Sequence, residues 1–274
     1  MSQFDTANRL FSTVGLTLLY YNFATTVDLE VERYWSGSRS WASVFFFINR
    51  YTAVLAHIPV VYEFFGLMPE SRCRQLQTFH QIYIVLGQGI VAICLLLRTH
   101  ALCMRDRRVL YVSGGMFMIA FAVCVWTITS VHLSQEPVPQ DMIAQPGCDL
   151  TVSINQAIFL AVAWGVMLVL DATVFTITFF QAIHMDRLWS HSLAHRMLID
   201  GALYFGVLAV FYLSDIVTYV VAPIAYKGVL TTLTNILSNV LVSRMMLNIR
   251  DPNLFELPRH WPEELGRLSA PEPR

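Results

Sequence analysis

The stretch VLYVSGGMFMIAFAVCVWTITSV, residues 109–131, decides the fold class. It holds no Asp, Glu, Lys or Arg over 23 positions, and about 20 apolar residues in an α-helix span the hydrocarbon core of a bilayer. Because hydrocarbon cannot hydrogen-bond a peptide group, a spanning segment is a helix or part of a closed barrel, and unbroken apolar runs favour a helix. The stretch is therefore predicted to be a transmembrane helix.

Six further apolar runs have comparable length, and turn or charge signals separate them. They cover residues 11–29, 41–65, 79–97, 154–180, 198–221 and 229–247. We therefore predict an all-α integral membrane protein in which residues 1–250 form a seven-transmembrane-helix bundle. Residues 251–274 contain five prolines and no apolar periodicity, which predicts a disordered tail.

The composition excludes several classes of function. The 274 residues are 55% hydrophobic and only 14% charged, whereas soluble domains carry roughly 25% charged residues. Seven spans leave no room for a soluble catalytic domain. The net charge of -1 provides no basic excess to neutralise phosphates, so we expect no nucleic-acid partner.

The basic residues predict the orientation in the bilayer. With seven spans, thirteen of the 18 Lys and Arg residues fall on one side and four on the other, while Arg50 lies within a helix. The positive-inside rule then places the amino terminus outside and the carboxyl terminus in the cytoplasm. We expect the plasma membrane, with an internal membrane as the alternative.

Short motifs along nearly the whole chain resemble a known family. They are Asp28-Leu29-Glu30-Val31, Asn49-Arg50-Tyr51, Leu97-Arg98-Thr99-His100-Ala101-Leu102, Asp200-Gly201-Ala202-Leu203-Tyr204-Phe205 and Ser243-Arg244-Met245-Met246-Leu247-Asn248. In this order they resemble fungal multi-pass membrane proteins that carry the domain of unknown function 6533. The resemblance implies a seven-helix, receptor-like fold and brings no activity with it.

Two cysteines fall on the predicted outer side. Cys73 stands just before the third predicted helix, and Cys148 stands in the long loop between the fourth and fifth. Because the outside is oxidising, the two thiols can close a bridge that ties this loop over the mouth of the bundle. Such a bridge resembles the disulfide of rhodopsin-like receptors. The alternative is two unpaired thiols.

An ion pair is predicted inside the bundle. Each charge placed in hydrocarbon costs roughly 2.5 to 3.5 kcal/mol on insertion scales and therefore requires a partner. Asp28 and Arg50 lie on neighbouring predicted helices, and an Arg side chain is long enough to reach a carboxylate along the helix. We predict that they pair, either to fix helix packing alone or to form a switch that opens on activation.

Further polar residues are predicted to face the bundle interior, for packing, a water network or contact with a polar ligand. They are Asp171, Asp215, Asn235 and Asn239. The two aspartates fall at different depths, which argues against an aspartyl-protease dyad, since that dyad needs two adjacent carboxylates. No nucleophile, metal-ligand set or paired-acid arrangement stands out. We therefore expect no enzyme activity, cofactor or metal.

The predicted cytoplasmic side presents a basic face. Its candidate residues are Arg98, Arg105, Arg107, Arg108 and Arg244. Topology and attraction to anionic lipid are sufficient to explain these charges, and contact with a cytoplasmic signalling protein is the functional alternative. The favoured hypothesis is a receptor-like sensor of a small molecule that enters from the outer side. A transporter or channel is the alternative, although no internal repeat supports it.

Overall fold

The structure is a computed structural model that describes residues 3–35, 40–103, 106–133, 145–146, 148, 153–186, 193–223 and 226–250. Nearly all of these residues are helical. The elements are α1 (Gln3–Thr25), α2 (Val27–Glu30), η1 (Val31–Trp35), α3 (Trp41–Phe65), β1 (Leu67–Met68), α4 (Glu70–Leu102), α5 (Arg107–Leu133), β2 (Gln145–Pro146), α6 (Ile154–Asp186), α7 (Leu193–Val221) and α8 (Thr231–Ile249). The predicted tail 251–274 lies outside the described residues.

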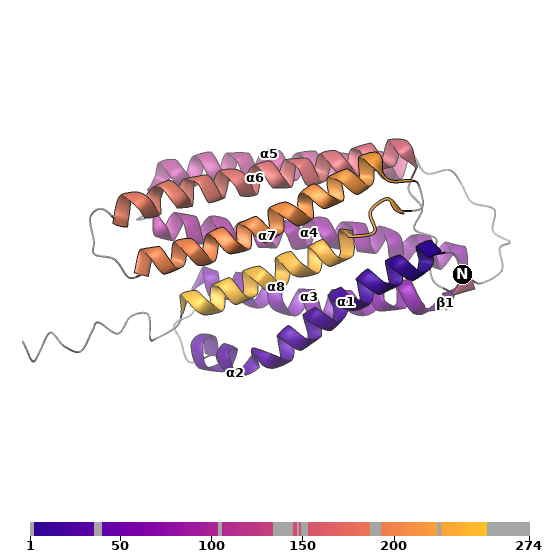
Figure 1. Cartoon of the computed structure of the whole chain (residues 1–274), viewed down its shortest axis with the longest axis horizontal. Helices are drawn as coiled ribbons and strands as arrows, with labels where there is room; N and C mark the ends of the chain where they lie inside the picture. The colour runs from indigo at the N-terminus through magenta and orange to yellow at the C-terminus, as the bar shows by residue number, and fades with distance from the viewer. Residues whose placement is uncertain are drawn as a thin grey trace, which may run out of the picture.

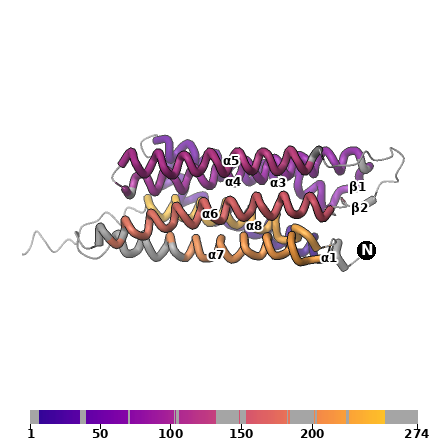
Figure 2. Tube along the Cα trace, turned by 90° about the horizontal axis from the view of Figure 1, so that it is seen from above, coloured from indigo at the N-terminus to yellow at the C-terminus, as the bar shows by residue number. Residues whose placement is uncertain are grey.

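The long helices run side by side along the longest axis of the molecule (Figure 1). Seen from above, α3, α4 and α5 form one layer, and α6, α7, α8 and α1 lie beneath it (Figure 2). At one end β1 pairs antiparallel with β2, and the start of α1 lies near this pair (Figure 1). We call this the disulfide end, because it also carries Cys73 and Cys148. The end of η1 and the start of α3 lie at the opposite end (Figure 1).

Five of the helices, α3 to α7, contain segments long and apolar enough to cross a membrane. The side chains that α5 and α7 expose are largely apolar, among them Ile119 (66% exposed) and Val210 (61% exposed). A soluble protein rarely exposes such a continuous apolar surface, whereas a lipid-facing surface requires one. Length, composition and exposure together indicate a helical, multi-pass membrane protein.

The α8 helix, in contrast, is polar and central. It packs against α1, α3, α4 and α7, and fourteen of its side chains are buried. Its polar residues are among the least exposed in the protein, with Thr234, Asn235 and Ser238 at 0%. Because these side chains bond to other helices instead of facing lipid, the low hydropathy of α8 follows from its central position.

Candidate functional site

The principal candidate site is a cavity of about 120 Å³ towards the disulfide end of the bundle. Its apolar wall comes from α4, α5 and α6 and includes Phe117, Phe121, Leu160, Trp164 and Met167. Its polar wall comes from α3, α4 and the start of α8. Small-molecule sites typically combine an apolar wall with a few convergent polar groups, as this cavity does.

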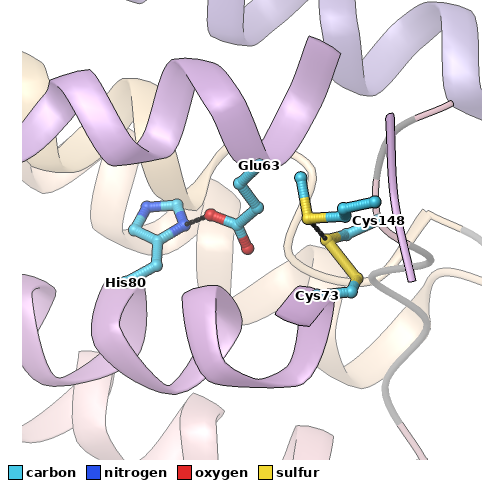
Figure 3. Close-up of a disulfide and its surroundings, with 5 residues drawn as sticks. Glu63, Cys73, His80 and Cys148 are labelled. Atoms are coloured by element: carbon cyan, nitrogen blue, oxygen red, sulfur yellow. Dashed lines mark hydrogen bonds and ion pairs between the residues drawn. A yellow bond between two sulfur atoms is a disulfide. The ribbon is translucent and has the colours of Figure 1, made fainter. Parts of the chain in front are cut away.

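A buried acid–base pair lies on the polar wall. Nδ1 of His80 on α4 is 2.8 Å from Oε2 of Glu63 on α3. Glu63 is fully buried and His80 is 7% exposed. Figure 3 shows the imidazole and the carboxylate pointing toward one another between the two helices. The pair therefore joins α3 to α4 inside the cavity.

The predicted cysteine pair lies beside these residues (Figure 3). The Sγ atoms of Cys73 and Cys148 are 2.14 Å apart, at disulfide-bonding distance. The backbone N–H of Cys148 also donates to the carbonyl oxygen of Glu63, with an N–O distance of 3.1 Å. The segment that carries Cys148 is thus attached to α4 by sulfur and to α3 by a hydrogen bond, next to the cavity.

The only lysine of the chain, Lys227, also lines the cavity. Its side chain is buried, at 8% exposed, and its ammonium group donates to the carbonyl oxygen of Tyr219. Gly228 follows with φ of 73°, and a Cβ atom there would lie 2.5 Å from the Tyr219 hydroxyl oxygen. Only glycine therefore fits at this position without displacing the turn that holds Lys227.

Asp215 lies close to this turn. Its Oδ1 accepts a hydrogen bond from the Thr231 hydroxyl at 3.3 Å, and the hydroxyls of Thr231 and Tyr219 are 2.8 Å apart. Asp215 is 0% exposed. Asp215 therefore lies inside the bundle, and its neighbours come from the start of α8 and from its own helix.

A layer of hydrogen-bonded side chains closes the cavity towards the opposite end. The Tyr212 hydroxyl donates to Oε1 of Gln88 at 3.1 Å, and Nε2 of Gln88 donates to the Ser238 hydroxyl at 2.8 Å. Asp171 lies beside the Tyr212 hydroxyl and is 4% exposed. We call Gln88, Tyr212, Ser238 and Asp171 the polar layer. It joins four helices, α4, α7, α8 and α6.

The two predicted asparagines, Asn235 and Asn239, extend the network of buried hydrogen bonds along α8. Nδ2 of Asn239 donates to the carbonyl oxygen of Asn235 at 2.7 Å. The carbonyl oxygen of Asn239 in turn accepts a hydrogen bond from Nδ2 of Asn49 on α3 at 3.1 Å, and Asn49 also bonds to the Ser243 hydroxyl at 2.9 Å. Buried polar groups therefore extend from the polar layer towards the opposite end of the bundle.

Arg50 forms a buried ion pair, but with a different carboxylate from the predicted one. Nε of Arg50 is 2.6 Å from Oε2 of Glu30, while Asp28 is exposed. The predicted Asp28 partner is therefore wrong. The sequence predicts one regular helix over residues 11–29, whereas α1 ends at Thr25 and the chain continues as α2 and the π-helical η1. This break turns Glu30 into the bundle.

Both members of the Glu30–Arg50 pair have further partners. The guanidinium donates to the Thr26 hydroxyl at 2.7 Å and to the Phe23 carbonyl oxygen at 2.9 Å. Oε1 of Glu30 accepts hydrogen bonds from the Tyr51 hydroxyl at 2.9 Å and from the indole N–H of Trp35 at 3.0 Å. A buried ion pair tolerates its desolvation only when such additional bonds are present.

The predicted basic face does not form one cluster among the described residues. Arg98 lies within the bundle, with Nη1 2.6 Å from Sδ of Met245. Arg244 bonds through Nε to Asn22, whereas Arg107 and Arg108 are exposed at the start of α5. Arg105 lies outside the described residues. Arg98, Arg107, Arg108 and Arg244 all lie towards the opposite end of the bundle, on α4, α5 and α8.

A second, smaller cavity of about 40 Å³ lies beyond the polar layer. Arg98, Asp171 and Tyr204 are among the residues that line it. The two cavities therefore lie on either side of the contact between Asp171 and Tyr212. In the part of the chain that the structure describes, no group of three or more His, Cys, Asp or Glu residues is placed to hold a metal ion.

The fold and site define the class as a helical, multi-pass membrane protein with a cavity at one end. Residues 10–55 match the model of the Family of unknown function (DUF6533). This segment contains the motifs Asp28-Leu29-Glu30-Val31 and Asn49-Arg50-Tyr51, which supply the two members of the Glu30–Arg50 pair. No match was found among curated proteins or among solved structures.

Sequence reasoning missed several residues of the site. Glu63 stands inside the predicted 41–65 helix, so the same cost of an intramembrane charge would have identified it as a residue that needs a partner. Gln88 and His80 stand inside the predicted 79–97 helix, where a polar side chain carries a similar but weaker signal. Lys227 precedes the predicted 229–247 helix, and nothing in the sequence indicated that its side chain is buried.

Proposed function

We propose that this protein is a seven-helix, receptor-like sensor of a small molecule. In this proposal α1 and α8 cross the membrane together with α3 to α7, the amino terminus is outside and the carboxyl terminus is in the cytoplasm. The sensor sits in the plasma membrane, and the disulfide end faces outwards. The length of α8, 19 residues, supports a crossing because at 1.5 Å per residue it reaches about 28 Å.

The observation that carries this proposal is a cavity joined to a buried polar path. The cavity lies beside the segment held by the cysteine pair. From its floor, Gln88 bonds to Ser238, and the carbonyl oxygen of Asn235 accepts from both Ser238 and Asn239. The carbonyl oxygen of Asn239 accepts in turn from Asn49. A ligand that changes the packing at the floor would change bonds along α8, and a cytoplasmic signalling protein would detect the change at the opposite end.

The test uses a variant that fills the cavity. Ala163 lines the cavity on α6, so Ala163→Phe places a ring in the ligand space. Val162→Phe adds the same ring on the neighbouring exposed position and is the matched control. Each variant is purified in mild detergent, and a heterotrimeric GTPase or another defined cytoplasmic partner is quantified in the preparation.

The sensor proposal predicts that Ala163→Phe changes the amount of bound partner by about fivefold or more, which is the lower range of allosteric coupling. Val162→Phe should retain the wild-type amount. Reproducible absence of any defined partner, or equal amounts in both variants, would contradict the proposal.

A transporter is the second candidate, and the pair of cavities favours it. Cavities on both sides of the Asp171–Tyr212 contact are the arrangement that a carrier alternating between two openings would need. A carrier moves a labelled solute across proteoliposomes, and Ala163→Phe would block this flux. A sensor changes its partner without net flux, so the two functions are separated by one reconstitution.

A further inference from the structure

We infer that the cavity at the disulfide end binds a small organic monoanion, an acid with one ring or a short apolar body, through Lys227. This inference rests on the proposed function, because it names the ligand class of the same cavity.

The charge of Lys227 is the first observation. The ammonium group is buried, and its hydrogen bond to the Tyr219 carbonyl oxygen is directed to a neutral acceptor. Within the described residues no carboxylate oxygen lies within 4.0 Å of its nitrogen. An ammonium carries three donors, and a buried charge without a counter-ion is costly. An anion in the cavity would supply the missing partner.

The other charged side chains that line the cavity favour an anion over a cation. They are Glu63 and His80, and these two pair with each other at 2.8 Å. A cationic ligand would therefore have to compete with His80 for Glu63, and it would be repelled by Lys227. An anionic ligand would instead contact Lys227, whose hydrogen-bond partner in the structure is the neutral carbonyl group of Tyr219.

The size and the wall of the cavity limit the rest of the ligand. The volume of about 120 Å³ is of the same order as the roughly 150 Å³ of a closed cavity that holds benzene, so the apolar part of the ligand has at most one ring. The wall opposite the polar residues contains Phe117, Phe121 and Trp164, whose rings pack against an aromatic or branched apolar group. Together with Lys227, these features fit a single-ring carboxylate such as benzoate.

The experiment measures binding without any signalling readout. The wild-type protein is reconstituted in nanodiscs of zwitterionic lipid, and its thermal unfolding is followed with benzoate and with benzamide, its uncharged analogue. Saturating benzoate should raise Tm by about 3 °C through preferential binding to the folded state. Benzamide should leave Tm unchanged. Equal shifts with both compounds, or none with benzoate, would overturn the inference.

Variants then locate the anion. Lys227→Met should weaken benzoate binding by about thirtyfold, whereas Lys227→Arg keeps a cation and should retain binding. Arg72→Gln removes an exposed cation at the same end and should bind as the wild type does. Because Lys227→Arg and benzamide are independent controls, a poorly folded Lys227→Met leaves the test intact. Undiminished binding in a folded Lys227→Met would contradict the assignment.

An anionic lipid headgroup could supply the same chemistry, and a second set of nanodiscs separates the two sources. Phosphatidylglycerol replaces part of the zwitterionic lipid, and benzoate binding is measured again. Unchanged affinity assigns the site to a free acid, as we infer, and competition by the lipid would overturn that assignment. If benzoate binds but never changes the partner in the co-purification test, the sensor proposal fails while the binding site stands.

Discussion

Glu30 and Arg50 form an ion pair inside the bundle, with Oε2 and Nε 2.6 Å apart and both side chains 2% exposed. The pair fastens the segment after α1 to the middle of α3, and all of it lies within residues 10–55, which match the family model. The chemistry of this contact is local: one carboxylate and one guanidinium form the pair, and the hydroxyls of Thr26 and Tyr51 donate or accept the hydrogen bonds that complete it.

Breaking this pair from one side should strongly destabilise the protein. Glu30→Gln leaves Arg50 as a buried cation without its carboxylate, and such losses cost about 3–5 kcal/mol. Asp28→Asn is the matched control, because the exposed Asp28 should change stability by less than about 0.5 kcal/mol. Thermal unfolding in detergent measures both variants. Equal losses of stability from the two substitutions would contradict Glu30 as the partner of Arg50.

The polar layer gives a second prediction. Gln88→Leu removes the bonds to Tyr212 and Ser238, and interhelical hydrogen bonds in membranes average about 0.6 kcal/mol and reach about 1.7. We expect a loss of about 1–2 kcal/mol in the free energy of unfolding. Gln75→Leu, an exposed glutamine on the same helix, should be nearly neutral. A neutral Gln88→Leu would show that these bonds do not stabilise the bundle.

The cysteine pair makes a third prediction. In denaturant without reductant, a thiol reagent should modify only Cys94, Cys103 and Cys124, the free cysteines. After reduction it should also modify Cys73 and Cys148, and mass spectrometry counts the added groups. Modification of all five residues before reduction would contradict the bridge. Cys73→Ala should destabilise the protein by about 2–5 kcal/mol, and adding Cys148→Ala should cost little more.

Apolar length alone was enough to predict the long helices. The expected range 41–65 coincides with α3, and each of the other expected ranges overlaps one long helix. The bounds differ where helices continue past the apolar run into polar residues. The clearest case is α4, which covers Glu70–Leu102 where 79–97 was expected, because a helix does not have to end where the hydrocarbon does.

Side-chain partners were harder to predict than helices. A helix predicted from hydropathy is regular throughout, so the break at Thr26 and the π-helical η1 could not be foreseen. Glu30 fell just beyond the predicted 11–29 helix. Lys227 depends in the same way on a turn with a positive φ at Gly228. The cysteine pair was predictable because it needed only that two residues fall at the same end of the bundle.

The positions of the two chain ends test the seven-span proposal most directly. Epitope tags are placed at the amino terminus and at the carboxyl terminus, and Ser153→Cys and Asp106→Cys report the two ends of the bundle from exposed positions. In intact cells, the amino-terminal tag and Cys at 153 should react with impermeant probes. The carboxyl-terminal tag and Cys at 106 should react only after permeabilisation. If 153 is outside but the amino-terminal tag is inside and the carboxyl-terminal tag outside, α1 and α8 do not cross and the proposal of a seven-helix sensor is wrong.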